Sequence, residues 1–483
     1  MNDDRARRLT LAATVLGSSL AFIDASVVVV ALPTIQHDLH FSLVGEQWVF
    51  LAYSLTLASL YLPAGAVGDR GGRRETFIAG IAGFALASVL AGAAPTGAVL
   101  IAARALQGVA AAFLATNSLA LLRETYGANA GRAVGLWTAF TSVATLGGPP
   151  LGGVIVEWVS WRWIFFINLP LAVAAIFLAQ QGRCPQLAKH RVGRLDVPGA
   201  ALAAAGFGML TYGMVEGAAH GFGTVWWAFA VAAGALAGFA VVERRAAEPM
   251  LPFALFRSRN FVLANLETFV VYGALGGMFF FFTIDLQFLG FSPAAAGLAN
   301  VPGSVVMILF SSRFGRLADE HGPRLLLSVG PVLVACGMVL FSFMREKTDF
   351  WVFGVPGLVV FSFGLSMVVA PITSTALSSA PEHFSGIAAG FNQTVSRLGN
   401  LLAVAVLGLV VLVVYQSNGG SHGVPLARGQ HDLQLRSASM DAFRVAMIVS
   451  AGLALAGAVI AALGISNADA RRAPERAEAA AAS

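Results

Sequence analysis

The chain has 483 residues, of which 57% are hydrophobic and 11% are charged, and its mean hydropathy is +0.76. Soluble domains carry about 25% charged residues, so this composition excludes a soluble globular protein and indicates an integral membrane protein. The net charge of +5 does not indicate a nucleic-acid partner, because the basic residues are sorted by membrane side.

Apolar runs fill almost the whole chain, and a membrane-spanning helix needs about 20 apolar residues. The first run contains Asp24 and is too long for a signal peptide, so we interpret it as a retained helix. The two cysteines, Cys184 and Cys336, indicate no disulfide framework. The runs predict fourteen spans, at 10–32, 45–67, 75–94, 97–121, 132–156, 163–181, 197–217, 223–242, 259–283, 293–313, 325–344, 350–373, 386–413 and 440–464.

The distribution of basic residues predicts the orientation. With an even number of spans, both termini lie on the same side. If that side is the cytoplasm, the inner face holds 22 Lys and Arg, including Arg132, Arg259 and Arg313 at the inner ends of their spans; the outer loops hold 5, and three lie deeper within spans. Cytoplasmic loops carry an excess of Lys and Arg. We therefore expect a multi-pass protein of the cell (inner) membrane with both termini in the cytoplasm.

The spans group into two halves with an extra pair between them. We expect an N-terminal six-helix bundle at residues 1–195 and an inserted transmembrane helix pair at 196–243. A C-terminal six-helix bundle at 244–466 begins with an interfacial linker. The tail, 467–483, alternates Ala with charged residues and is expected to be disordered and cytoplasmic.

A charged turn between two spans occurs twice, at 65–74 and at 315–324. Both copies have Gly, then Asp four residues later, then Gly three residues further, and then a closing Arg. A motif repeated at matched places predicts two related halves. Internal repeats of this kind are typical of secondary transporters, whose binding site lies between the halves.

The Asp of each turn lies at the C-terminal end of a helix, where the helix dipole disfavours a negative charge. A neighbouring Arg or the N-terminus of another helix would stabilise it. The turn is therefore a candidate for a conformational latch. Alternatively, its glycines only allow close packing and its charges only mark the cytosolic edge. The latch candidates are Gly65, Asp69, Arg70, Arg73 and Arg132 in the first half and Gly315, Asp319 and Arg324 in the second.

The first copy resembles the motif G-x-L-a-D-r-x-G-r-k of the major facilitator superfamily, with Val67 in place of Leu, and the second copy has Leu317. This pattern is specific when it lies between two membrane helices. The resemblance implies the major facilitator fold.

Asp24 lies inside the first span. A charge at this depth costs several kcal/mol, so an intramembrane carboxylate is a functional hypothesis by default. At about 1.5 Å per residue, Asp24 and Arg104 of the fourth span reach nearly the same depth. We consider two interpretations: a permanent structural ion pair, and a carboxyl group that loses and regains a proton.

Three further stretches resemble motifs of drug:proton antiporters. Arg104 to Gly108 resembles R-x-x-Q-G, which in the family is associated with proton coupling. The stretch from 144 to 153 resembles the antiporter signature G-x-x-x-G-P-x-x-G-G with Ala at its first position, and similar motifs follow at 161–170. The two prolines of the stretch from 144 to 153 are expected to break the regular helical ladder and let neighbouring helices approach. The residues of this antiporter-motif helix are Gly148, Pro149, Gly152 and Gly153.

Polar residues also lie within spans of the second half. Glu267 and Arg397 are about 12 and 16 Å from the inner ends of their spans, so they are candidates for a second pair, and Glu267 is an alternative proton carrier. The helix around Arg397 resembles helix 13 of the same antiporters. Helix packing without substrate contact explains these residues equally well. The substrate-cavity candidates are Gln107, Asn392, Gln393 and Arg397.

Taken with the fourteen spans, these motifs resemble the fourteen-helix drug:proton antiporters of EmrB/QacA type. The implied fold is an all-α membrane protein with two six-helix bundles and a central inserted pair. The implied function is proton-coupled multidrug efflux of lipophilic compounds, with cations among the candidates, by alternating access. The expected partners are a small lipophilic substrate, protons and membrane lipids. No nucleic acid, cofactor or metal is expected, and the expected state is a monomer.

Other functions remain as alternatives. The motifs do not separate a multidrug exporter from a proton-coupled exporter of one endogenous metabolite, antibiotic or lipid. A multi-pass membrane enzyme is a remote alternative, because the sequence has no H-E-x-x-H, no G-x-S-x-G and no clustered His/Cys ligands. An ATP-driven pump is disfavoured because neither Lys189 nor Lys347 follows a P-loop glycine pattern.

Overall fold

The computed structural model describes residues 3–40, 42–126, 130–182, 197–245, 253–380, 385–420, 424–430 and 432–467. Residues 183–196, part of the expected interfacial linker and nearly all of the expected disordered tail lie outside these residues. The described residues form helices and no strands.

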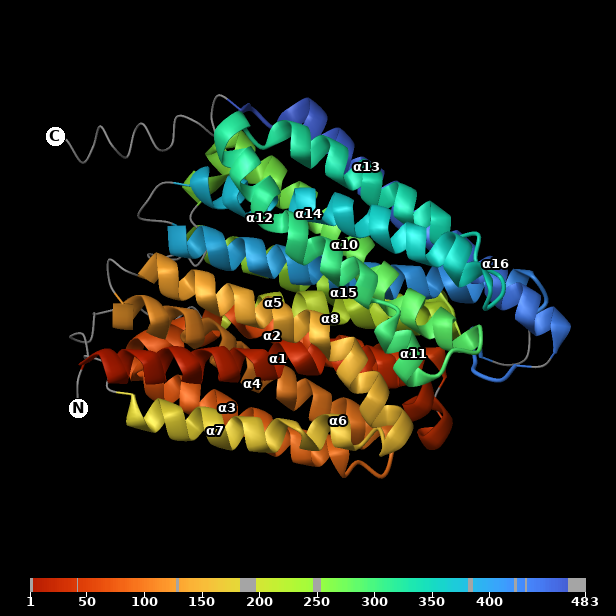
Figure 1. Ribbon diagram of the computed structural model, residues 1–483, viewed down its shortest axis with the longest axis horizontal. Helices are drawn as coiled ribbons and strands as arrows, with labels where there is room; N and C mark the ends of the chain where they lie inside the picture. Colours follow the sequence, from red (N-terminus) through yellow and green to blue (C-terminus); the bar gives the residue numbers. More distant parts are fainter. Residues whose placement is uncertain are drawn as a thin grey trace. The chain divides into compact units, whose positions relative to one another are not determined.

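The helices follow one another along the chain (Figure 1). Those of the first half are α1 (Asp3–Leu39), α2 (Leu43–Gly71), α3 (Arg73–Gly92), α4 (Gly97–Tyr126), α5 (Ala130–Trp158), α6 (Trp163–Phe166), α7 (Asn168–Gln181), α8 (Val197–His220) and α9 (Phe222–Arg245). Those of the second half are η2 (Phe253–Arg257), α10 (Arg259–Phe288), α11 (Pro293–Leu298), α12 (Val301–His321), α13 (Arg324–Phe341), η3 (Phe350–Gly354), α14 (Val355–Ser378), α15 (Ser385–Ser417) and α16 (Leu433–Gly464).

Twelve helical segments among the described residues are long and apolar enough to cross a membrane. Each coincides with one of the expected spans. The two other expected spans coincide with α5 and α8, helices of 29 and 24 residues that are not among the twelve. The structure therefore supports a multi-pass, all-helical membrane protein, and the count of fourteen spans stays a prediction.

The chain divides into two compact units. The first unit comprises Met1–Pro249 and the segment Phe291–Leu298, and the second comprises Met250–Gly290 and Ala299–Ser483. The pair α8 and α9 belongs to the first unit. So does the short helix α11, although α10 and α12 on either side of it belong to the second unit.

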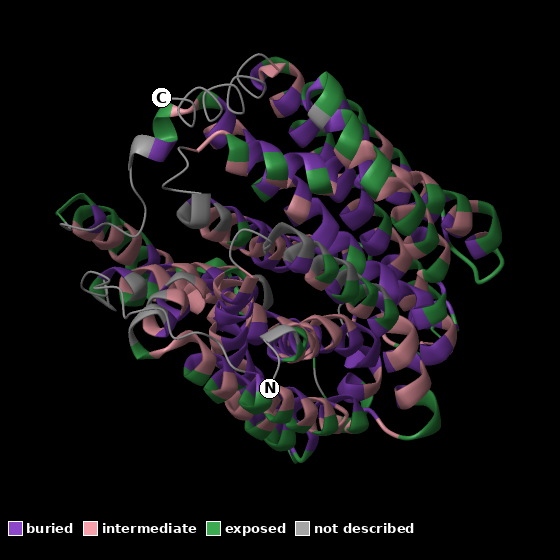
Figure 2. Cartoon of the chain, turned by 60° about the vertical axis from the view of Figure 1, so that its left-hand side comes forward, coloured by how far each residue is buried: buried purple, intermediate pink, exposed green. Residues whose placement is uncertain are grey.

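In the first unit the core lies among α1, α2, α3, α4 and α7. Phe77 and Phe84 of α3 and Leu114 of α4 are fully buried there. In the second unit α10 is the most buried of the twelve spans, and it packs against α14, α15 and α16. Buried and exposed faces alternate around the helices of both units (Figure 2). This pattern fits membrane helices that pack through part of their surface and face lipid with the rest.

The repeated turn has the same backbone conformation in both copies. Gly72 ends α2 with φ +105°, and its N–H donates to Gly68 O at 3.0 Å. Gly322 ends α12 with φ +92°, and its N–H donates to Ala318 O at 2.8 Å. Only glycine adopts such a conformation readily. The second glycine of the repeated motif is therefore explained by the sharp reversal between two helices.

Candidate functional site

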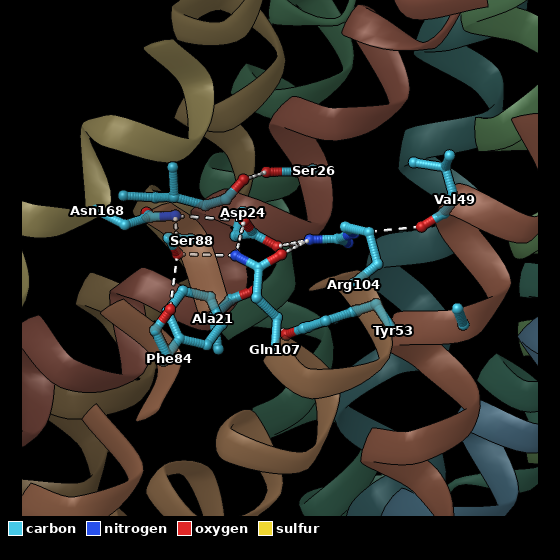
Figure 3. Close-up of polar contacts among 12 residues, drawn as sticks. Ala21, Asp24, Ser26, Val49, Tyr53, Phe84, Ser88, Arg104, Gln107 and Asn168 are labelled. Atoms are coloured by element: carbon cyan, nitrogen blue, oxygen red, sulfur yellow. Dashed lines mark hydrogen bonds and ion pairs between the residues drawn. The ribbon is translucent and has the colours of Figure 1, made fainter. Parts of the chain in front are cut away.

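The structure brings Asp24 and Arg104 together inside the first unit. Arg104 Nη1 of α4 donates to Asp24 Oδ2 of α1, and both side chains are 0% exposed. The close-up in Figure 3 shows the two side chains pointing toward each other between the helices. A buried ion pair needs further hydrogen bonds to offset the loss of hydration of both charges.

Neutral side chains from three helices supply those bonds. Gln107 accepts from Arg104 Nη1 at 2.8 Å and donates to Asp24 Oδ1 at 3.2 Å. Asn168 Nδ2 of α7 also donates to Asp24 Oδ1, at 3.3 Å. Ser88 Oγ of α3 accepts from both amides, at 2.8 and 3.3 Å, and so links them (Figure 3). The carboxylate thus accepts from three donors, which is the pattern of an ionised acid.

The guanidinium is also oriented by α2. Arg104 Nε donates to Val49 O at 3.2 Å, and its carbon lies 4.4 Å from the centre of the Tyr53 ring, a cation–π contact. Arg104 Nη2 is buried with no hydrogen-bond partner among the described residues. The Nε and Nη1 atoms of the guanidinium therefore have hydrogen-bond partners, whereas Nη2 has none among the described residues.

The local sequence explains why α4 comes so close to α2. A Cβ atom at Gly108 would overlap Tyr53 O and Thr56 Oγ1. Thr56 Oγ1 in turn donates to Ala105 O of α4 at 2.9 Å. The glycine that closes the R-x-x-Q-G motif is thus required by the close approach of two helices, one turn away from the ion pair.

The glycines of the antiporter-motif helix pack in two directions. A Cβ at Gly148 would overlap Ser26 Oγ, and one at Gly152 would lie 2.8 Å from Val27 Cγ1, so both sit against α1 just after Asp24. A Cβ at Gly153 would instead lie 2.7 Å from Ala294 Cα of α11. α5 is one helix from Ala130 to Trp158 and continues through Pro149 and Pro150, which have no N–H to donate to its hydrogen-bond ladder. A Cβ atom at Gly297 of α11 would overlap Pro149 O, so α5 and α11 also approach each other closely at this point.

The structure describes only some of the side chains of the latch candidates. The side chains outside the description are those of Asp69, Arg70, Arg132 and Asp319. Arg73 Nη1 donates to Ala120 O at 3.3 Å and lies 3.8 Å from Glu124 Oε2.

The first glycine of each copy makes only ordinary contacts. A Cβ at Gly65 would be 4.0 Å from Thr116 Cβ, and one at Gly315 would be 3.7 Å from Ala370 Cβ. Neither position requires the absence of a side chain for packing.

The last arginine of each turn makes an equivalent contact in each unit. Arg74 Nε donates to Ala179 O at 2.8 Å, at the C-terminal end of α7. Arg324 Nε donates to Ala462 O at 3.0 Å, at the C-terminal end of α16. A cation there satisfies free carbonyl groups and complements the helix dipole. Arg324 is among the latch candidates predicted from the sequence and Arg74 is not, although both occupy the closing position of the repeat.

Asn168, Ser88 and Tyr53 are also site residues that sequence analysis did not select. The available signal was a buried amide inside the motif at 161–170. Gln107, proposed as a cavity residue, is fully buried in the ion-pair network.

The second-half candidates lie in different surroundings. Asn392 Nδ2 of α15 donates to Asn265 Oδ1 at 3.1 Å and to Thr268 Oγ1 at 3.0 Å, whereas Gln393 is exposed. Glu267 is fully buried, and neither carboxyl oxygen has a hydrogen-bond partner among the described residues. No ion pair joins it to Arg397 in the part of the chain that the structure describes. Matched depth did not produce a pair here, because Glu267 lies on the side of α10 that faces α16.

Metal binding has no candidate residues in the described ranges, where no group of three His, Cys, Asp or Glu side chains comes together. The ionisable groups of the site are one acid and one base, so its available chemistry is proton transfer and charge pairing.

The sequence pattern of the Major Facilitator Superfamily matches residues 14–404. The chain belongs to this superfamily. It is 34% identical over 418 residues to the Multidrug resistance protein Stp of Mycobacterium tuberculosis, covering 84% of this chain and 76% of that protein. It is 33% identical over 409 residues to the Tetracenomycin C resistance and export protein of Streptomyces glaucescens, covering 83% and 75%. The Cephamycin export protein CmcT of Amycolatopsis lactamdurans is 34% identical over 421 residues, covering 85% of each chain.

Solved structures agree on the fold. A bacterial homologue of the human lysosomal transporter Spinster, in its inward-facing and occupied conformation, matches with a TM-score of 0.69. The match covers 94% of this chain and 96% of that one at 16% sequence identity. Identity at this level supports the fold of the superfamily alone.

Proposed function

We propose that the chain is a proton-coupled antiporter that exports lipophilic drugs or antibiotics from the cell by alternating access. The observation that carries this proposal is the buried Asp24–Arg104 pair. The Asp24 carboxylate is shielded from water and bound by one cation and two amides. A change in its charge would therefore change these interactions.

Protonation supplies the coupling step. A proton on Asp24 removes the negative charge that compensates Arg104, and a buried cation without its counter-ion is strongly disfavoured. The neighbouring helices are then driven toward an arrangement in which Arg104 finds another partner or water. Loss of the proton restores the pair. One carboxyl group that alternates in this way couples an inward proton movement to an outward substrate movement.

The substrate class comes from the relatives. Their names describe multidrug resistance in one case and export of single antibiotics in others. We therefore keep a second candidate within the same mechanism, a proton-coupled exporter of one endogenous metabolite, antibiotic or lipid. The names of the tetracenomycin and cephamycin exporters favour it.

The remaining parts of the proposal concern the architecture. We place fourteen helices in the cell membrane, with both termini in the cytoplasm and α8 and α9 as an inserted pair. Asp69 and Asp319 are proposed latch residues of the repeated turn, and Asn392, Gln393 and Arg397 are proposed contacts of the substrate cavity.

The test is transport by the purified protein in proteoliposomes with an imposed pH gradient, using a fluorescent lipophilic cation and a panel of uncharged antibiotics. The wild type should accumulate at least one compound against its gradient, with a stoichiometric proton flux in the opposite direction. Asp24→Asn should abolish accumulation while downhill movement of the same compound remains. Asp38→Asn, an exposed acid on the same helix, is the matched control and should transport like the wild type.

Each outcome decides between the alternatives. A single transported compound in the panel favours the specific exporter, and several unrelated compounds favour the multidrug exporter. Accumulation driven equally well by Asp24→Asn and the wild type would remove Asp24 from the coupling mechanism.

A further inference from the structure

The second unit contains a buried carboxyl group that the mechanism above does not use. Glu267 lies on α10, about 12 Å along the helix from its first residue. Its side chain is 0% exposed, and neither oxygen has a hydrogen-bond partner among the described residues. Asp24, by contrast, has three donors.

The polar groups nearest in sequence are already committed to one another. Asn265 Nδ2 donates to Phe261 O at 2.8 Å, and Thr268 Oγ1 donates to Ala264 O at 2.7 Å. The oxygens of both accept from Asn392 of α15. This network lies on the side of α10 that faces α15, and Glu267 is excluded from it.

Glu267 instead faces α16. A Cβ atom at Gly457 would lie 3.8 Å from Glu267 Cγ and would press on Val271. From residue 445 to its end at Gly464, α16 has no ionisable residue, and neither has α14. The carboxyl group is therefore enclosed by apolar and small side chains on this side.

A single cation lies well inside a helix that packs on α10. Apart from Tyr415, Arg397 is the only ionisable residue of α15, and it is half-buried and close enough to Tyr272 of α10 to interact with it electrostatically. The other ionisable residues of α10 are Asp285, near its far end, and Arg259, whose Nη2 donates to Leu463 O. On α16, the ionisable residues Arg436, Asp441 and Arg444 all lie before residue 445, and Arg444 is exposed. None of these groups is paired with Glu267.

We infer that Glu267 is a second proton-binding site, which holds its proton in the arrangement of helices seen here. An ionised carboxylate with no donor and no cation is far costlier to bury than a neutral carboxylic acid. The neutral carboxyl group also lacks hydrogen-bond partners here. An arrangement of helices that gave it partners would therefore lower the free energy of this group. A movement of α10 against α15 or α16 that exposes Glu267 to water or to Arg397 would release the proton. The link to transport rests on the proposed function, whereas the protonation state does not.

Infrared spectroscopy tests the protonation state directly. Purified protein at neutral pH should show an absorption of protonated carboxyl groups that is lost, in part, in Glu267→Gln. The contributions of other carboxyls are the same in both proteins and cancel in the difference spectrum. Asp38→Asn is the matched control: it removes an exposed carboxyl group of the first unit, so this substitution should leave the band unchanged. Equal bands in the wild type and Glu267→Gln would overturn the inference.

A second measurement separates a functional carboxyl from a structural one. Glu267→Leu removes an unsatisfied polar group, so the melting temperature should rise or stay the same. Asn392→Leu removes a hydrogen-bonded group of the same unit, so its melting temperature should fall. If Glu267 takes part in coupling, Glu267→Leu should also lower the number of protons moved per substrate molecule. A large drop in its melting temperature would contradict the inference, and an intact proton count with a lost band would confine Glu267 to a static site.

Discussion

Asp24 and Arg104 compensate each other's charge inside the first unit. Both side chains are fully buried, and the carboxylate is the counter-ion of the guanidinium. Gln107, Asn168 and Ser88 complete the network but carry no charge, so they cannot replace either partner. Removing one charge should therefore be worse than removing both.

This predicts a strong non-additivity of stability. Asp24→Asn leaves Arg104 buried without a counter-ion, which typically costs about 3–5 kcal/mol. In the double variant Asp24→Asn/Arg104→Gln no charge remains, and much of that loss should be regained. Melting temperatures of the wild type, both single variants and the double variant form a double-mutant cycle that measures the coupling. Additive losses would show that the two side chains do not depend on each other.

Depth along a helix can be calculated from the sequence, and for Asp24 and Arg104 that was enough to name the partner. It was insufficient for Glu267 and Arg397, because a pair also requires that both residues face each other around their helix axes. Rotation of each helix is set by packing, such as the approach of Gly457 to α10. The same limit explains why Asn168 and Ser88 were missed: a neutral polar residue in an apolar span has many possible partners.

At the scale of elements, α5 connects the ion-pair helix with α11. Gly148 and Gly152 lie against α1, and Gly153 lies against the start of α11. Glu157 Oε2 accepts from Ala294 N at 3.0 Å, where α11 begins. The motif therefore makes two close contacts within the same unit. One is with α1 near Asp24, and the other is with α11, which precedes α12 in the chain.

Two glycines of α5, Gly147 and Gly153, make a matched test. Gly153→Val places side-chain atoms where Ala294 and the Pro293 carbonyl now lie, and overpacking of this kind typically costs about 1–3 kcal/mol. Gly147→Val is the control, because a Cβ there meets nothing within 4 Å. We expect a lower melting temperature and slower transport for the first variant and little change in either quantity for the second. Equal effects would mean that the close approach of α5 to α11 contributes nothing.

The repeated turn shows how far a motif predicts local structure. Its second glycine and its last arginine have the same role in both units, as the repeat implied: a sharp reversal at Gly72 and Gly322, and a capped helix end at Arg74 and Arg324. The prolines of α5 remove two donors from the helical hydrogen-bond ladder, but the helix continues through them. Membrane helices tolerate proline because neighbouring groups satisfy the freed carbonyls.

At the scale of the whole molecule, apolar runs located the helices well, because spanning length is fixed by the hydrocarbon thickness. Their assignment to units was less accessible. Nothing in the composition of Phe291–Leu298 indicates that it belongs with the first unit. That placement depends on close contacts with Gly153 and Pro149 of α5, more than 130 residues earlier in the chain.

Orientation in the membrane follows from charge, and it decides the direction of transport. The contrast of 22 to 5 Lys and Arg predicts that the turn between α2 and α3 faces the cytoplasm and that the connection between α8 and α9 faces outside. Single cysteines can report this in a background without Cys184 and Cys336. Gly72 is unsuitable as a labelling site because its positive φ would strain a cysteine.

Gly71 and Gly223 are better sites, because both are exposed and a Cβ at either position meets no atom closer than 3.8 Å. In whole cells, Gly223→Cys should react with an impermeant maleimide, whereas Gly71→Cys should react only after the membrane is permeabilised. The reverse pattern would place the termini outside. Because protons enter the cell down their usual gradient, an antiporter in that orientation would still export, but it would load substrate on the side of α8 and α9. The pair of cysteines therefore determines which end of the first unit receives the substrate.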